Sequence, residues 1–263
     1  NVMVDNKLAS HLVAGSVSSL QYATRLYQLP LGLFAIAIST AILPRLSEKW
    51  ATGNRSDYAK MLNRGIKISL LIVVPATLGL FVLGKPIIKL LFEHRNFLPS
   101  DTLRTTHVLH LYLVGLIGYS FVTLFSRAFY SMKDTITPVI VSSIAVGVNV
   151  GLDLLLIGPM KVGGLALATG VSGLVNGLLL LIAFRKKTGL QGFLPGDFFL
   201  ARVLASVGVM GGVVFAVRQF IPLVTDFSTV TLGVFVGILS YFCAGFLFGL
   251  KETFVEEIIQ LGD

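Results

Sequence analysis

The sequence predicts an all-α integral membrane protein, and its composition and apolar runs indicate this class. Hydrophobic residues make up 54% of the 263 residues and charged residues only 13%, whereas a soluble domain carries about a quarter charged residues. Apolar runs of about 20 residues recur along the chain, and such a run lets a helix cross a hydrocarbon core of about 30 Å. Because no long alternating strand pattern occurs, we expect a polytopic bundle of helices.

Eight apolar segments are predicted to span the membrane. They lie at residues 2–17, 20–47, 65–84, 103–131, 136–157, 163–185, 198–219 and 228–249. Two polar stretches are expected at the membrane surfaces, with a short amphipathic helix within 47–65 and a second short helix within 85–97. The lone cysteine, Cys243, lies in an apolar run, so the sequence contains no disulfide framework.

Basic residues indicate the orientation of these spans. The formal net charge is +8, but Lys and Arg cluster at predicted helix ends, which favours membrane anchoring over nucleic-acid binding. Thirteen basic residues fall on one side, namely Arg45, Lys49, Arg55, Lys60, Arg64, Lys67, Arg127, Lys133, Arg185, Lys186, Lys187, Arg202 and Lys251. Six fall on the other, namely Lys85, Lys89, Arg95, Arg104, Lys161 and Arg218. We expect the richer side to be cytoplasmic.

An arginine and a proline mark the second predicted span. Arg25 lies near its start, Pro30 follows about one and a half turns later, and no charge occurs between Leu31 and Leu43. An arginine within a span is costly unless it faces a watery cavity, although at the outer interface it can extend to lipid headgroups. Pro30 breaks the helix, either as a hinge that lets the preceding part swing or as a plain structural kink.

Four polar side chains are predicted to meet at one depth between three spans. Asn149 and Asp153 are spaced i,i+4 on one helix face. Counting from the short turn 158–162 at 1.5 Å per residue places Asp153 about 7 Å and Asn149 about 13 Å away, with Thr169 about 9 Å into the next span. Asp5 lies about 18 Å below the outer end of its own span, so it joins the group if that span packs on this hairpin.

This set of two carboxylates, an amide and a hydroxyl offers hard oxygen ligands for one cation. It suits Na⁺, or a proton shared between the acids, and the backbone carbonyl of Leu165, one turn before Thr169, is a further candidate ligand. Because acids within spans are usually functional, we expect a cation here, within the lobe and away from Arg25. The structural alternative is a hydrogen-bonded polar bridge with one acid protonated.

Two other patterns are interpreted as structural. Three GxxxG pairs predict close helix packing, at Gly147 and Gly151, Gly173 and Gly177, and Gly233 and Gly237. His107 and His110 form an i,i+3 pair without an evident third ligand, which favours a solvated helix end over a zinc site. No Ser-His-Asp set, cysteine cluster, Walker loop or catalytic carboxylate pair stands out, so no enzyme is predicted.

Four segments carry a resemblance to a known family. They are VDNKLAS (4–10), GSVSSLQYATRLYQLPLGLFAIAISTAILPRLS (15–47), AFYSMKDTITP (128–138) and IGPMKVGGLALATG (157–170). These segments resemble the MurJ (MviN) family, the lipid II flippases of bacterial cell-wall synthesis. The resemblance implies that 1–187 form the second six-helix lobe of a two-lobe flippase. It also implies that 188–250 form two final spans with a groove for the lipid tail, and that 251–263 form a cytoplasmic amphipathic tail.

The resemblance also implies a function. A flippase of this kind moves lipid II, an undecaprenyl-pyrophosphate-linked disaccharide-pentapeptide, from the inner to the outer leaflet of the bacterial cytoplasmic membrane by alternating access. Arg25 would then bind the pyrophosphate in a central cavity, with a bidentate guanidinium contact, and cation coupling would involve the Asp5 group. The expected partners are lipid II, membrane lipids and the missing N-terminal lobe, with no nucleic acid.

Two other functions remain open. A related polysaccharide-lipid or multidrug exporter would share the fold, although a cationic cavity arginine opposes the binding of cationic drugs. A non-transporting membrane scaffold for cell-wall synthesis is the other alternative, and the costly acids within its spans oppose it.

Overall fold

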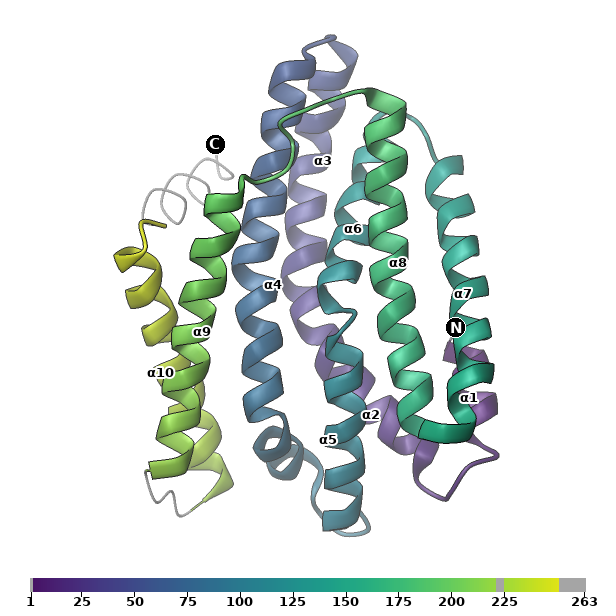
Figure 1. The fold of residues 1–263 in the computed structure, drawn as a ribbon, viewed down its shortest axis with the longest axis vertical. Helices are drawn as coiled ribbons and strands as arrows, with labels where there is room; N and C mark the ends of the chain where they lie inside the picture. The colour runs from purple at the N-terminus through teal and green to yellow at the C-terminus, as the bar shows by residue number, and fades with distance from the viewer. Residues whose placement is uncertain (1, 221–224, 251–263) are drawn as a thin grey trace.

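The computed structural model describes residues 2–220 and 225–250, and every regular element in these ranges is helical (Figure 1). The elements are α1 (Val2–Ala9), α2 (Ser16–Pro30), the π-helical turn η1 (Leu31–Ala35), α3 (Ile36–Ala51), α4 (Arg55–Phe92), α5 (Pro99–Leu113), α6 (Leu116–Ser131), α7 (Ile136–Met160), α8 (Val162–Thr188), α9 (Asp197–Phe220) and α10 (Asp226–Leu247). The all-α polytopic fold is therefore confirmed. The predicted tail 251–263 lies outside the described residues.

Among the described residues, six helical units are long and apolar enough to cross a membrane, and there are seven if the bent pair α5–α6 is counted as one span. The helix from Ser16 to Ala51, which joins α2, η1 and α3, is one of the six. The prediction of a span over 2–17 is wrong, because α1 ends at Ala9 and the chain turns before Ser16. Gly15 lies in this turn with φ of 87°, a conformation that glycine adopts without steric cost.

The two predicted surface helices are also not separate elements. α3 continues to Ala51, and α4 begins at Arg55 after a three-residue turn. Asn54 starts α4 as its N-cap, since its side-chain oxygen accepts a hydrogen bond from the backbone N–H of Asp57 at 3.1 Å. α4 then runs through Pro75 and Pro86, and Figure 1 shows its last turns bending away from the helix axis. The polar stretches thus extend membrane helices beyond their apolar parts.

The break predicted at Pro30 is a π-helical turn inside a continuous helix. Proline has no N–H, so the carbonyl of Leu26 loses its usual partner four residues on. The helix continues as five residues of π-helix, Leu31–Ala35, before α3 begins. Such π-helical turns occur frequently at functional sites. That Pro30 acts as a hinge remains a prediction.

The connections between helices gather at the two ends of the elongated bundle (Figure 1). The α3–α4, α6–α7 and α8–α9 connections lie at the upper end, and the α4–α5 and α7–α8 connections lie at the lower end. This grouping of loops agrees with the two sides inferred from basic residues. The assignment of the richer side to the cytoplasm remains a prediction.

Glycines allow the closest helix contacts, although not at every predicted pair. A Cβ built on Gly118 of α6 would lie 2.5 Å from the carbonyl oxygen of Gly173 in α8, and one on Gly177 would lie 2.7 Å from the carbonyl oxygen of Gly118. The prediction is wrong for Gly147 and Gly151, where a built Cβ meets nothing within 4 Å among the described residues. That face of α7 is therefore open in this chain.

Candidate functional site

Arg25 lies beside a cavity of about 190 Å³. The cavity is lined by polar and apolar residues of three helices, namely Asp5, Asn6, Leu20, Gln21, Thr24, Arg25 and Tyr112. The arginine side chain is exposed, and its guanidinium carbon lies 5.9 Å from the ring centre of Tyr22. Arg25 makes no ion pair with any residue that the structure describes. Its charge is therefore available to an anionic group in the cavity.

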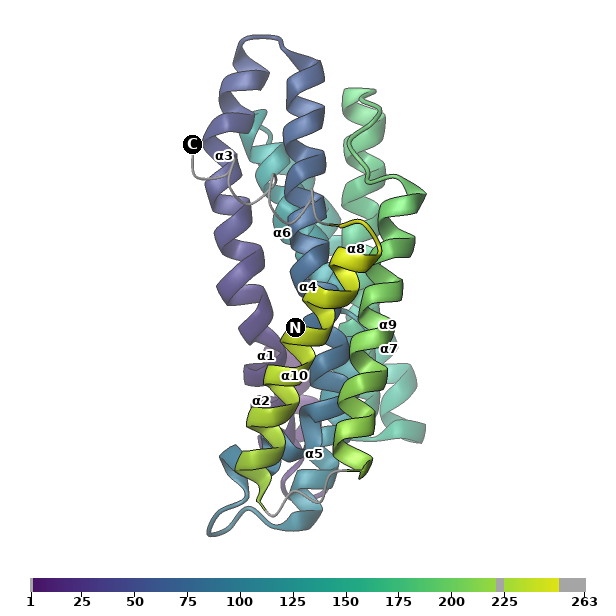
Figure 2. The same ribbon diagram turned by 90° about the vertical axis from the view of Figure 1, so that its left-hand side faces the viewer.

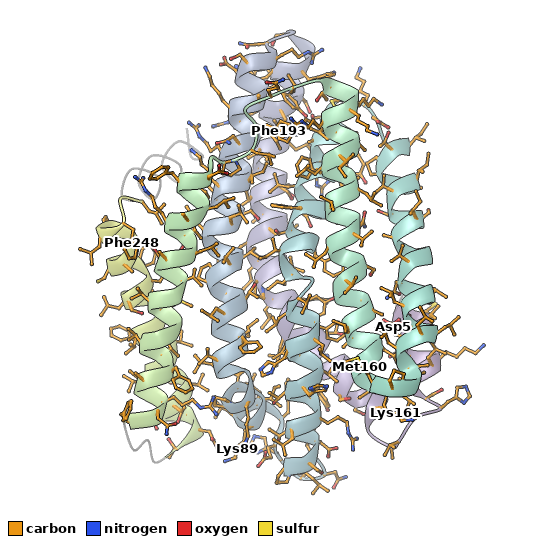
Figure 3. All side chains as sticks on the ribbon, viewed as in Figure 1. Asp5, Lys89, Met160, Lys161, Phe193 and Phe248 are labelled. Atoms are coloured by element: carbon orange, nitrogen blue, oxygen red, sulfur yellow. The ribbon has the colours of Figure 1, made fainter. Side chains whose placement is uncertain are left out.

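The four predicted polar side chains do converge, in the core between α1, α7 and α8. The side chains of Asp5, Asn149, Asp153 and Thr169 are all buried. The Thr169 hydroxyl donates a hydrogen bond to Asp5 Oδ2 at 3.1 Å, and Asn149 Nδ2 donates to Thr169 Oγ1 at 3.4 Å. The Asp5 carboxyl also lies within hydrogen-bonding reach of the Asp153 carboxyl. Figure 3 shows Asp5 beside the lower halves of α7 and α8.

The tight α7–α8 hairpin explains this convergence. A single residue, Lys161, separates the two helices, and Asp153 and Thr169 lie at equal sequence distances from it. A Cβ built on Gly164 would lie 2.4 Å from the carbonyl oxygen of Leu156, so glycine permits the close approach of the two helices. Because helices rise uniformly, equal separations from the turn give equal depths.

Four oxygen atoms in this cluster are buried without a hydrogen-bond donor. They are Asp5 Oδ1, Asn149 Oδ1 and both carboxyl oxygens of Asp153. Two carboxyl groups can bond each other only when one carries a proton, and unpaired buried polar atoms are costly. A hard cation such as Na⁺ or a shared proton would satisfy them. The donor set therefore fits either species.

Leu165 occupies the position expected for a carbonyl ligand, one turn before Thr169 on α8. Its side chain is fully buried in an apolar cluster with Val162 and Ala166. In a regular helix its carbonyl bonds the N–H of Thr169, which leaves one lone pair for a ligand. Among the described residues, no group of three His, Cys, Asp or Glu side chains could hold a metal. A metal site here would therefore need amide, hydroxyl or carbonyl oxygens in addition to the two carboxylates of Asp5 and Asp153.

The expectation that the cation group lies away from Arg25 is wrong. Asp5 belongs to the polar cluster and also lines the Arg25 cavity. The two sites are thus neighbours that share one side chain. The reason is the turn after Ala9, which brings α1 beside α2 instead of letting it continue as a long span.

Several residues at this site were not predicted. Tyr112 of α5 lines the cavity, and its ring stacks on Tyr27 of α2 at 4.9 Å. Tyr119 of α6 donates a hydrogen bond from its hydroxyl to the backbone carbonyl of Thr169 at 3.1 Å. Gln21 also lines the cavity. Its i,i+4 spacing from Arg25 places both residues on one helix face, and this pattern could have indicated it from the sequence. The tyrosines come from other helices, so no local pattern indicated them.

The histidine pair supports the structural interpretation. His110 Nε2 lies 2.9 Å from the carbonyl oxygen of Phe81, and the two rings stack at 4.3 Å. His107 lies near Gly163, where a built Cβ would be 2.9 Å from its Nε2 atom. These contacts use the histidines in helix packing, and no zinc site is proposed.

A helix with a π-helical turn, an arginine at a polar cavity and two buried acids within a bundle of candidate spans define a polytopic α-helical membrane protein. Residues 1–246 match the family model described as "Lipid II flippase MurJ". The chain belongs to this family of flippases and is a multi-pass protein of the bacterial inner membrane.

Individual relatives agree with the family match. The chain is 40% identical over 180 residues to a probable lipid II flippase MurJ of Rhizobium meliloti, covering 68% of this chain and 34% of the relative. It is 33% identical over 261 residues to a probable lipid II flippase MurJ of Thermotoga maritima, covering 99% of this chain and 51% of the relative. The chain thus spans about half the length of the curated relatives that it matches.

A solved structure shares the fold. It is described as "Lipid II flippase MurJ, inward closed conformation", and its match covers 98% of this chain and 51% of that structure. The TM-score is 0.81 at 31% sequence identity. The helical arrangement described above is therefore similar to that of about half of this solved structure.

Proposed function

We propose that the protein carrying this chain flips lipid II from the inner to the outer leaflet without changing it chemically. The observation that carries the proposal is Arg25 at a polar cavity, on a helix with a π-helical turn, in a chain that matches the flippase family over residues 1–246. A guanidinium binds diphosphate oxygens with two parallel hydrogen bonds, so it suits a pyrophosphate-linked lipid.

The parts of the chain divide as the family resemblance implies. Residues 1–187 would supply the second lobe, 188–250 would supply two final helices beside the lipid tail, and the missing N-terminal lobe would complete the cavity. Pro30 and η1 would form the hinge, because the π-helical turn replaces regular hydrogen bonds beside Arg25. Closure of one lobe on the other would then expose the cavity to each side of the membrane in turn.

Replacement of Arg25 tests the proposal. Arg25→Ala should lower lipid II flipping about tenfold or more, because one charge-assisted hydrogen bond is worth about 1.5–3 kcal/mol. Arg25→Lys should also lower it, since the charge stays but the planar fork is lost. The measurement is lipid II flipping by the purified protein in vesicles, with membrane insertion checked separately.

Arg127→Lys is the matched control, because its guanidinium also lies over a tyrosine ring, 6.0 Å from the centre of Tyr130, but outside the cavity. Normal flipping by Arg25→Ala would contradict the proposal. Flipping of lipid carriers without a diphosphate would favour a broader exporter, and an absence of transport by the wild type would favour the scaffold.

We also propose that Asp5, Asn149, Asp153 and Thr169 bind one Na⁺, with the Leu165 carbonyl as a further ligand. The support is the set of four buried oxygens that lack donors. Sodium should raise the Tm of the protein in detergent and potassium should do so much less, since a ligand that binds only the folded state stabilises it. Asp153→Asn should remove the difference between the two salts while the protein stays folded.

A shared proton gives a different result in the same experiment. It predicts no sodium effect, but a pH dependence of Tm that disappears in Asp153→Asn. Equal Tm values in sodium and potassium, with no pH dependence in the wild type or in Asp153→Asn, would contradict both the sodium site and the shared proton. The hydrogen-bonded polar bridge would then be the better explanation. Because transport is not the measurement, this outcome is independent of the Arg25 result.

A further inference from the structure

Two prolines interrupt the backbone hydrogen bonding of α4. In a regular helix each N–H bonds the carbonyl four residues earlier, and proline has no N–H. Pro75 therefore leaves the carbonyl of Leu71 without its usual partner, and Pro86 does the same for Val82. Inside a membrane no bulk water is present to bond such a carbonyl.

Side chains of α9 and α10 bond both of these carbonyls. The Tyr241 hydroxyl of α10 donates to the Leu71 carbonyl at 2.8 Å, and both residues are buried. Arg218 Nη1 of α9 donates to the Val82 carbonyl at 2.9 Å. Each carbonyl that a proline leaves unpaired thus receives a hydrogen bond from the last two helices.

Between the prolines, leucines of α4 fit against glycines of the same two helices. A Cβ built on Gly211 of α9 would lie 2.5 Å from Leu78 Cδ2, and one on Gly233 of α10 would lie 2.8 Å from Leu83 Cδ2. Figure 2 shows α9 and α10 running alongside α4. The contact therefore combines close packing with hydrogen bonds along the same stretch of α4.

An ion pair closes the contact near the end of α4. Lys89 Nζ lies 2.9 Å from Asp226 Oδ2, in the first turn of α10. Figure 3 shows Lys89 at the lower end of α4, near the start of α10. Because lipid tails are as apolar as leucine side chains, such polar contacts and close packing decide where membrane helices associate.

We propose that Pro75 and Pro86 make α4 the docking helix for the α9–α10 pair, with Tyr241 and Arg218 as positioning residues. These two side chains replace the hydrogen bonds that the prolines remove, so the pair is attached to the lobe at a fixed register. The pair then moves with the lobe as one body. This last consequence rests on the proposed function, whereas the docking itself does not.

A double-mutant cycle tests the docking in the complete protein in detergent. Tyr241→Phe should lower Tm by a few degrees. In the Pro75→Ala background it should lower Tm by less than half as much, because the alanine N–H can bond the Leu71 carbonyl. An equal loss in both backgrounds would overturn the proposal.

A second cycle keeps the test informative if Pro75→Ala disturbs folding. Arg218→Met should lower Tm by less in the Pro86→Ala background than in the wild type. The hydrogen bond from Arg218 to the Val82 carbonyl lies at an exposed end of the contact. Tyr58→Phe is the matched control, since its hydroxyl bonds the carbonyl of Ala128, which no proline affects. Tyr58→Phe should lower Tm by the same amount with and without Pro75→Ala.

A disulfide tests the motion. In a disulfide each Cβ lies about 3 Å from the opposite sulfur. The Cγ atom of Leu78 is bonded to Cβ, as the sulfur of a cysteine would be, and it lies 3.3 Å from the Cβ built on Gly211. Leu78→Cys with Gly211→Cys, in the complete protein with Cys243 and any other native cysteine replaced, should therefore cross-link and leave flipping unchanged relative to the reduced protein. A large loss on oxidation would overturn the single moving body. Failure of the wild-type protein to flip in the same assay would instead contradict the proposed function.

Discussion

Asp134 joins three helices at the upper end of the bundle. Its Oδ1 atom accepts hydrogen bonds from the backbone N–H groups of Ile136 at 3.1 Å and Thr137 at 3.0 Å, at the start of α7. Its Oδ2 atom accepts from the Thr137 hydroxyl and from the Lys187 ammonium, at the end of α8. A residue in the turn after α6 therefore fixes the start of α7 against the end of α8.

These contacts give stability that depends on pH. Burial raises the pKa of Asp134, but the hydrogen bonds from Lys187 and Thr137 outweigh this effect. The pKa is therefore lowered from its ordinary value of 3.8 to about 2. Because the pKa is lower in the folded state, the stabilisation is complete above about pH 4 and is lost as pH falls toward 2. Asp134→Ala should therefore lower Tm by a few degrees at pH 6 and by less at pH 2.5. A loss that is the same at both pH values would contradict the ion pair.

At the scale of the helix, the α6–α8 contact depends on glycine. A Cβ on Gly118 would lie 2.5 Å from a backbone oxygen of α8, which cannot move aside without shifting the helix. Gly118→Ala should therefore destabilise the protein by about 1–3 kcal/mol, as overpacking does. Gly147→Ala is the matched control, because a Cβ there meets nothing within 4 Å among described residues. It should be neutral or slightly stabilising, since alanine favours helix.

Thermal unfolding of both variants in one detergent measures this difference. A similar Tm for the two variants would mean that α6 and α8 separate easily, and that the glycine contact is not required for packing.

The same helices show which features the sequence predicts well. The depth of Asp153 and Thr169 follows from helix rise and a short turn, so counting residues was sufficient. The end of α1 was not predicted, because residues 10–15 contain no proline and, apart from His11, are apolar or small. The contacts of Tyr112 and Tyr119 were also hidden, since they depend on how α5 and α6 pack against other helices.

For α4 the sequence indicated the prolines but not their consequence. The predicted span over 65–84 already includes Pro75, and the helix continues through both Pro75 and Pro86. The partners of the carbonyls that the prolines leave unpaired lie more than 130 residues away in the chain, and sequence patterns describe only near neighbours. The tertiary structure was needed to connect them.

For the whole molecule, the distribution of charge predicts the orientation in the membrane. Of the thirteen basic residues that the sequence assigns to one side, the twelve that the structure describes belong to the helix ends at the α3–α4, α6–α7 and α8–α9 connections or near them, and six belong to the other end. Since positive residues are retained in the cytoplasm during insertion, that end should face inward. The turn between α3 and α4 then lies inside the cell, and the start of α5 lies outside.

Two serines at opposite ends test this orientation. Ser56, near the start of α4, and Ser100, near the start of α5, are both exposed. In the complete protein with Cys243 and any other native cysteine replaced, a cysteine at position 56 should resist an impermeant thiol reagent in intact cells and react once the membrane is opened. A cysteine at position 100 should react in intact cells. The reverse pattern would invert the topology, with the turn between α3 and α4 outside the cell.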